Sequence, residues 1–268
     1  MSRVTWEAAD CGERDHDNSD PADPTSEPHG LACVLLEELR SRAEPGNVEG
    51  MARFGISAEG TLGVSMPVVR ELARDAKRRL GRGVATARHT LAVDLWDSRI
   101  HEARILAALV DDPSRVDSEQ MDRWALDLDS WDVCDQLCGS LFDKTPLAWD
   151  KAVEWSSRPE EFVKRAGFVL MTQLAVHDKR APDNAFRPFF PLIERECTDE
   201  RHYVKKAVNW ALRQIGKRSA GLRTEAIAVA ERILAGKVDS AAARWIARDA
   251  LRELTSEPVT ARLAARER

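Results

Sequence analysis

The sequence predicts an all-α fold in which antiparallel helix pairs stack into a superhelical solenoid. From residue 31 onward, about a dozen segments place apolar residues at helical spacing, and short connectors separate them. No stretch alternates between apolar and polar residues, so nothing in the sequence predicts a β-sheet. Two helices with their turns occupy roughly 35–45 residues, which is the length of a HEAT-type repeat. The competing layout is a compact helical bundle.

Local signals mark the ends of the predicted helices. The first, residues 31–43, ends at Glu44-Pro45-Gly46. The next, residues 66–80, begins after Ser65 as its cap and has Pro67 in its first turn. The other predicted helices are residues 84–96, 100–110, 118–128, 131–142, 146–156, 160–177, 185–197, 202–218, 223–235 and 240–254.

Composition divides the chain into three parts. Residues 1–30 hold eight acids against two arginines and almost no apolar periodicity, so they are predicted to form a disordered acidic tail. Because the whole chain has a net charge of −5, the part after this tail is close to neutral. Residues 31–256 form the predicted helical domain, and residues 257–268 are interpreted as a C-terminal tail.

The cysteines and the hydropathy pattern indicate the compartment. The five cysteines are an odd number without the spacing of a disulfide framework, and no membrane-spanning apolar run or signal peptide is recognised. Cys134 and Cys138, four residues apart, are interpreted as packed thiols, because no further Cys or His lies close to them in sequence. We therefore expect a cytoplasmic monomer without a bound metal or cofactor.

The predicted helix at residues 202–218 carries two stripes. One is apolar and predicted to be buried. The other turns away from it and consists of Lys206, Trp210, Arg213 and Lys217, at positions i, i+4, i+7 and i+11. Residues 201–218 hold six bases and no acid, and cations around an exposed aromatic ring suit a nucleic-acid backbone and its bases. A merely solvated face, or burial of Trp210 against a neighbouring helix, remains open.

A second segment, residues 127–146, combines acids with tryptophan. Trp131 and Asp135 are four residues apart, so they share one face near the start of a helix. Asp132 lies in the first turn, where a carboxylate favours the helix dipole, and is interpreted as structural. Asp135 has no basic residue at i±3 or i±4, which leaves either a plain surface acid or a functional one.

The strings GVSMPVVRELA, HEARILAALVDDP, DSWDVCDQLCGSLFDKTP, EEFVKRAGFVLM and YVKKAVNWALRQIGKR resemble the HEAT-like-repeat DNA alkylation repair proteins, the AlkD-type superfamily. The resemblance covers roughly residues 48–254 and implies a helical solenoid that cradles duplex DNA in its concave face. It also implies excision of N3- and N7-alkylated purines without extrusion of the base, with no metal, cofactor or covalent nucleophile. Residues 31–256 would then be a DNA-binding domain for double-stranded DNA with alkylated bases.

The resemblance also assigns roles to residues. Trp131 and Asp135 match the family's tryptophan and the catalytic aspartate four residues later, and Trp210 matches its second tryptophan, which faces the sugar. Arg165, preceded by the basic Lys164, matches the active-site arginine. The expected catalytic set is thus Asp135, Trp131 and Trp210, and the expected DNA contacts are Arg165, Lys164, Lys206, Arg213 and Lys217.

This chemistry suits the residues. A purine alkylated at N3 or N7 is cationic, so the remaining barrier is the developing positive charge on the deoxyribose. A fixed carboxylate offsets that charge, and indole faces add cation–π attraction. A charge pair at ~4 Å is worth about 4 kcal/mol at an effective dielectric of 20, or roughly a thousandfold in rate. Asp135 is therefore expected to be exposed and ionised between Trp131 and Trp210, with Arg165 on a nearby phosphate.

One departure keeps a second function open. The family's glycosylases carry a helix with an aromatic residue before the position of Gly55-Ile56, whereas MARFGI, residues 51–56, is short and has no tyrosine. The alternative is a non-catalytic DNA-binding repair protein that recognises damaged or branched DNA by shape. A protein-binding solenoid is disfavoured by the basic stripe around Trp210. The other tryptophans at helical spacing among apolar neighbours are predicted to be core: Trp96, Trp124, Trp149, Trp155 and Trp245.

We expect deletion of residues 1–30 to leave helix content and melting temperature nearly unchanged, because this segment has little apolar surface to bury. Loss of its acids should also slightly tighten non-specific binding to DNA. Circular dichroism during thermal denaturation measures the first effect. A large drop in melting temperature would show that the tail packs on the domain.

Overall fold

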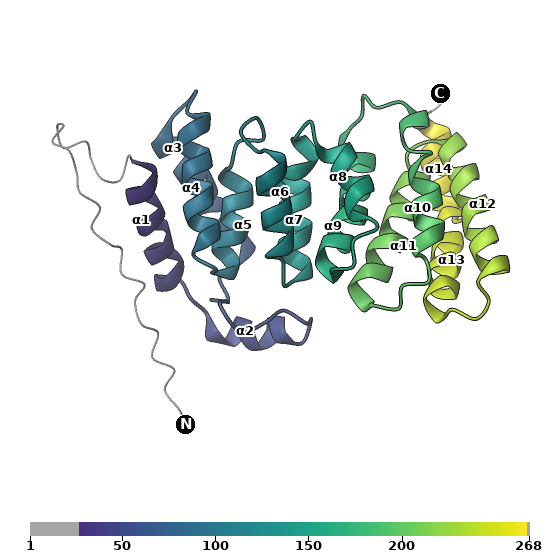
Figure 1. The fold of residues 1–268 in the computed structure, drawn as a ribbon, viewed down its shortest axis with the longest axis horizontal. Coiled ribbons are helices and arrows are strands. Elements are labelled where there is room, and N and C mark those ends of the chain that lie inside the picture. Colours follow the sequence, from purple (N-terminus) through teal and green to yellow (C-terminus); the bar gives the residue numbers. More distant parts are fainter. Residues whose placement is uncertain (1–26, 267–268) are drawn as a thin grey trace.

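The computed structural model describes residues 27–266, and the part of the predicted acidic tail before residue 27 lies outside the described residues. Within that range the chain folds into helices joined by short turns and contains no strand (Figure 1). The α-helices are α1 (Pro28–Ser41), α2 (Pro45–Ala52), α3 (Met66–Leu80), α4 (Ala85–Asp97), α5 (His101–Val110), α6 (Ser118–Leu126), α7 (Trp131–Ser140), α8 (Ala148–Trp155), α9 (Glu161–His177), α10 (Phe189–Glu196), α11 (His202–Gly216), α12 (Ala220–Gly236), α13 (Ala241–Leu254) and α14 (Glu257–Arg266). Two short 3-10 helices are η1 (Phe142–Lys144) and η2 (Asp183–Ala185).

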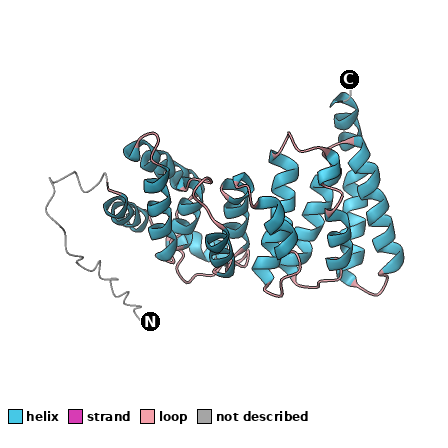
Figure 2. Ribbon diagram, turned by 45° about the horizontal axis from the view of Figure 1, so that its top comes forward, coloured by secondary structure: helices cyan, strands magenta, loops and turns pink. Residues whose placement is uncertain are grey.

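The helices form two layers. One layer, which we call the inner layer, runs α3, α5, α7, α9, α11 and α13, each packed on the next. Helices α4, α8 and α12 pack on α5, α9 and α13 from the other side, so consecutive helices form the pairs of a solenoid. Figures 1 and 2 show these pairs following one another in a row from α1 to α13. The predicted all-α solenoid of stacked helix pairs is confirmed.

The helix signals act largely as predicted. The apolar stripe of α11 is buried, and burial of such a stripe is what holds a short helix in place. Side chains of Asp117, Ser219 and Ser240 cap α6, α12 and α13 by accepting from backbone N–H groups three residues on. Ser65 occupies the N-cap position of α3 but makes no side-chain cap hydrogen bond.

Aromatic rings join successive pairs through the core. Trp96 and Trp124 stack with their ring centroids 4.2 Å apart, and Phe142 links Trp124 to Trp155. Trp96 and Trp155 satisfy their indole N–H groups on carboxylates at 2.9 and 2.8 Å. The prediction that Trp245 belongs to the core is wrong, because its side chain is 40% exposed.

The structure corrects two ends of the predicted elements. The first helix, α1, ends at Ser41, and Pro45 then begins a further helix, α2. Proline is favourable at the first helical position because the N–H that it lacks would have no partner there. The predicted C-terminal tail, residues 257–268, instead contains α14, which buries Val259 and Leu263. Four residues apart, these two share one helix face.

The boundary of the acidic tail also moves. Helix α1 begins at Pro28, and Leu31 is completely buried, so residues 28–30 belong to the helical domain rather than to a tail. A deletion that ends at residue 26 therefore tests the tail more cleanly than one that removes the first turn of α1. No helix among the described residues is long and apolar enough to cross a membrane.

Helices α8 and α9 approach closely at Gly167. A Cβ built there would lie 2.7 Å from the Ser156 backbone nitrogen and 2.9 Å from the Trp155 carbonyl carbon, neither of which can move aside like a flexible side chain. We expect Gly167→Ala to destabilise the protein by about 1–3 kcal/mol through overpacking. Urea denaturation measures this change. Gly236→Ala, in open space, is the control and should leave stability unchanged or slightly higher; equal effects of the two variants would contradict the close approach.

Candidate nucleic-acid interface

A groove of about 410 Å³ opens on the inner layer, beside the N-terminal halves of α7 and α9, along α11 from His202 to Arg213, and against α13. Six of the eight residues predicted as functional line it, from three separate segments: Trp131, Asp135, Arg165, Lys206, Trp210 and Arg213. Five of its lining residues carry large aromatic rings: Phe54, Trp131, Tyr203, Trp210 and Trp245. So many aromatic faces in one groove suit nucleobases, which stack on aromatic rings, and the sugars attached to them.

Asp135 is held by Arg165. The guanidinium Nη2 lies 2.8 and 2.9 Å from the two carboxylate oxygens, and Nε lies 3.2 Å from Oδ1. Arg165 also donates from Nη1 to the backbone carbonyl of Tyr203 at 2.8 Å, and its side chain is 5% exposed. The expectation of an exposed Asp135 is therefore wrong, because its side chain is only 18% exposed and Arg165 directs its donors to Asp135 and to the Tyr203 carbonyl.

Burial decides the ionisation of Asp135. Removal from water raises the pKa of its carboxyl to about 6, against the charge and hydrogen bonds of Arg165, which lower the pKa. Above pH 6 the carboxylate form predominates. Because the folded protein binds this proton more tightly than the unfolded chain does, Asp135 disfavours folding increasingly as pH rises from about 4 to about 6.

The segment after α2 forms one wall of the groove and was missed by the sequence analysis. Phe54 is 71% exposed, and its backbone carbonyl accepts the indole N–H of Trp131 at 3.0 Å. The next carbonyl, of Gly55, accepts the hydroxyl of Tyr203 at 3.3 Å. Gly55 has φ +78°, and a Cβ there would lie 1.9 Å from the Tyr203 hydroxyl, so only glycine fits.

Glu102 holds the other end of this segment. Its buried carboxylate accepts the backbone N–H groups of Leu62, Gly63 and Val64 at 2.6–3.2 Å. Because both ends are bonded to helices of the inner layer, Phe54 is presented beside Trp131 by a fixed piece of backbone. In the sequence, the signals that could have indicated this segment were the pair Phe54-Gly55 and the glycine-containing turn that follows it.

The basic stripe of α11 is not uncompensated. Arg213 pairs with Asp249 at 3.6 Å and with Glu253, and Lys217 also pairs with Glu253. Both acids lie on α13, so no spacing rule within α11 could reveal them. Lys206, by contrast, is exposed and makes no hydrogen bond or ion pair with any residue between 27 and 266.

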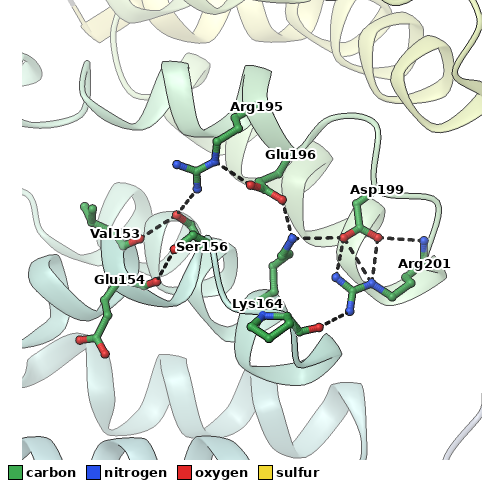
Figure 3. Close-up of polar contacts among 10 residues, drawn as sticks. Val153, Glu154, Ser156, Lys164, Arg195, Glu196, Asp199 and Arg201 are labelled. Carbon is green, nitrogen blue, oxygen red and sulfur yellow. Dashed lines mark hydrogen bonds and ion pairs between the residues drawn. The ribbon is translucent and has the colours of Figure 1, made fainter.

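Lys164 does not belong to the groove. Figure 3 shows its ammonium between the carboxylates of Glu196 and Asp199, with Arg201 on the far side of Asp199. Its side chain is largely buried among these partners. Successive residues of a helix point about 100° apart, so Lys164 faces α10 while Arg165 faces the groove. We therefore drop Lys164 from the expected DNA contacts.

Trp245 adds a further aromatic ring to the groove. It lies on α13, and the Lys205 ammonium sits 5.9 Å from its ring centroid. Asp132, interpreted as structural, pairs with the buried His101 at 2.8 Å and is not a lining residue of the groove.

Comparison with known proteins gives a match to a family model and a likeness to a solved structure. Residues 35–254 match the family model described as DNA alkylation repair enzyme. A solved structure, described as a new family of proteins related to the HEAT-like repeat DNA glycosylases with affinity for branched DNA structures, is similar in fold, with a TM-score of 0.62 at 19% identity. The match covers 74% of this chain and 81% of that one. No curated protein matches.

Replacing Arg165 by methionine should raise the pKa of Asp135 further above its ordinary value, because the guanidinium favours the ionised carboxylate. Carbon-detected NMR of the side-chain carboxyl during a pH titration measures the shift. Asp132 is the internal control on the same helix. Burial opposes its ionisation, yet the hydrogen bond from His101 keeps its pKa lowered, and that bond is untouched in the variant. An Asp135 pKa that stays at about 6 would contradict the ion pair.

Proposed function

The chain belongs to the DNA alkylation repair enzyme family, and from that premise we propose that it binds DNA in the aromatic groove and hydrolyses the N-glycosidic bond of N3- or N7-alkylated purines. The observation that carries the proposal is the carboxylate of Asp135 in a groove that Trp131 and Trp210 also line. We propose double-stranded DNA with alkylated bases as the substrate of a monomeric protein.

The groove offers the contacts that DNA requires. Aromatic faces accept bases or sugars by stacking, and the unpaired Lys206 at the groove is free for a phosphate. Arg213 is a weaker candidate than the sequence implied, since a phosphate must compete there with Glu253. Fewer cations should therefore contact the DNA phosphate backbone than the basic stripe of α11 suggested.

Catalysis would act on charge that develops in the transition state. The alkylated purine leaves as a neutral base, and the deoxyribose becomes cationic. Asp135 would stabilise that cation electrostatically, and Trp131 and Trp210 would add cation–π attraction. No atom of the chain needs to bond covalently to the sugar, because water supplies the new C–O bond and its proton is released to solvent.

Arg165 affects the electrostatic stabilisation that Asp135 can provide. Its two-point hydrogen bond fixes the orientation of the Asp135 carboxylate, which keeps the charge in place without reorganisation. Its positive charge also cancels part of the field at the sugar. The stabilisation of about 4 kcal/mol for an isolated charge pair at ~4 Å is therefore an upper bound here.

A second function is favoured by one observation. Phe54 is a large, exposed apolar side chain on fixed backbone at the edge of the groove. Such a ring can stack on a base step that is already open, as at a junction or a gap. The solved relative is itself described as having affinity for branched DNA. The alternative is thus a non-catalytic protein that binds damaged or branched DNA by shape.

Release of free base from duplex DNA that contains 7-methylguanine or 3-methyladenine tests the proposal. Asp135→Asn keeps the size of the side chain but removes its charge, so the rate should fall by about one to three orders of magnitude, with affinity for undamaged duplex changed only a few fold. The wild-type rate should rise with pH up to about 6 and then level off, because only the ionised carboxylate stabilises the cation. Asp129→Asn, an exposed acid just before α7, is the matched control and should keep full activity.

Two results would redirect the assignment. Full activity of Asp135→Asn would remove this residue from the mechanism. Binding of alkylated duplex by the wild type without any release of base would favour the non-catalytic function. In that case affinity should be higher for a four-way junction than for linear duplex, and Phe54→Ala should abolish the difference.

A further inference from the structure

A second cavity of about 390 Å³ lies at the C-terminal ends of α9 and α11, two of the helices that line the aromatic groove. It opens beside the last turns of α9 and α11, whereas Arg165 and Lys206 lie near the first turns of the same helices. Figure 1 shows α2 at one edge of the row of helices and the C-terminal end of the chain at the other. The groove extends along α11 as far as Arg213, so the second cavity begins where the groove ends, at the C-terminal ends of α9 and α11.

The side chains that line this cavity are strongly cationic. Lys179, Lys217, Arg218 and Arg262 stand against a single acid, Asp183. Asp183 accepts a hydrogen bond from Ser219 and lies 3.8 Å from the Arg218 guanidinium. We call these four cations and the space between them the basic pocket.

Two of the four cations are fixed by the protein. Arg218 donates to the backbone carbonyls of Ala175 and Ala181, and its guanidinium lies 4.3 Å from the ring centroid of Phe186. Lys217 is paired with Glu253. The backbone contacts of Arg218 hold its positive charge in the wall of the pocket, whereas Glu253 neutralises Lys217.

The other two cations are free. Lys179 and Arg262 are exposed, and neither side chain makes a hydrogen bond or an ion pair with the residues that the structure describes. Cations near the last turn of a helix are favoured by its dipole, which accounts for Lys217 and Arg218. The dipole does not account for Arg262, which comes from the middle of α14. The cations come from the loop after α9, the turn after α11 and the middle of α14, and their convergence on one cavity indicates an anionic ligand.

Phosphate is the chemistry that suits this set. Guanidinium groups bind phosphate oxygens through paired N–H donors, and lysine adds a mobile point charge. Lys206 and Lys217 are 11 residues apart on α11, which corresponds to roughly 17 Å along the helix. One nucleotide cannot bridge this distance, whereas the two backbones of a duplex face each other across a major groove about 12 Å wide.

We propose that the basic pocket binds the phosphate backbone of the second strand of a duplex whose first strand lies in the aromatic groove. This inference rests on the proposed DNA binding of that groove. The first strand would then lie along the groove, and the second strand would lie at the C-terminal ends of α9 and α11. The chain would accordingly distinguish double-stranded from single-stranded DNA through Lys179 and Arg262, which lie far from Asp135 in the fold.

The test compares duplex and single-stranded DNA of equal length in a salt titration of binding. The double variant Lys179→Ala/Arg262→Ala should weaken binding of duplex and lower its salt slope by about two units, since each lost phosphate contact removes about 0.9. Binding of the single strand should be unchanged. Lys206→Ala should weaken both ligands, and Arg180→Ala, an exposed neighbour outside the pocket, should affect neither.

The possible failures are distinguishable. If the double variant weakens single strand and duplex alike, the pocket follows the first strand and the assignment to the second is overturned. If the double variant changes nothing while Lys206→Ala weakens both ligands, the pocket does not contact DNA and the proposed function stands. If Lys206→Ala also changes nothing, DNA binding in the groove itself fails. Inorganic phosphate that binds the wild type but not the double variant, while both bind duplex equally well at constant ionic strength, would assign the pocket to a free anion and overturn the proposal.

Discussion

The ion pair between Asp135 and Arg165 is the contact on which the groove depends. One guanidinium joins the carboxylate of α7 to the backbone of α11 from its place on α9, so three successive helices of the inner layer meet at a single side chain. Tyr203, whose carbonyl it holds, in turn bonds to Gly55 in the segment after α2. A buried pair of this kind is costly to break, because either partner left alone is an uncompensated charge away from water. The geometry of Trp131, Phe54 and Tyr203 is therefore tied to one electrostatic contact.

The same ion pair also limits the amount of unpaired charge in the groove. Asp135 keeps its carboxylate in place only because Arg165 offsets part of the cost of burial, and its raised pKa shows that the offset is incomplete. Arg213 and Lys217 are likewise neutralised by acids of α13. The groove thus presents aromatic surface with few free charges, which favours recognition by stacking over recognition by net attraction.

Some cations of the protein have no ion-pair partner among the described residues. Lys206 beside the groove and Lys179 and Arg262 in the basic pocket make no ion pairs within the described chain. Lys164 and Arg201, by contrast, join α9 to the loop before α11. Since a cation paired inside the protein gains little from binding a phosphate, unpaired cations are better indicators of a DNA-facing surface than basic composition.

The sequence by itself determined the helices and the apolar stripes that stack them, and the resemblance of its motifs to a known family implied the meeting of Trp131, Asp135, Arg165 and Trp210. These features depend on spacing within one helix or on a motif, and both are written in consecutive residues. Only the tertiary structure decided the partners: that Asp249 and Glu253 neutralise the stripe of α11, that Lys164 turns away from its neighbour Arg165, that Trp245 is exposed, and that Phe54 is held at the groove. The physical reason is that helical spacing tells which face of a helix is polar but not which side chains the next helix sets opposite it. Burial and charge pairing depend on those opposing side chains, which here lie 30 to 77 residues away in the chain.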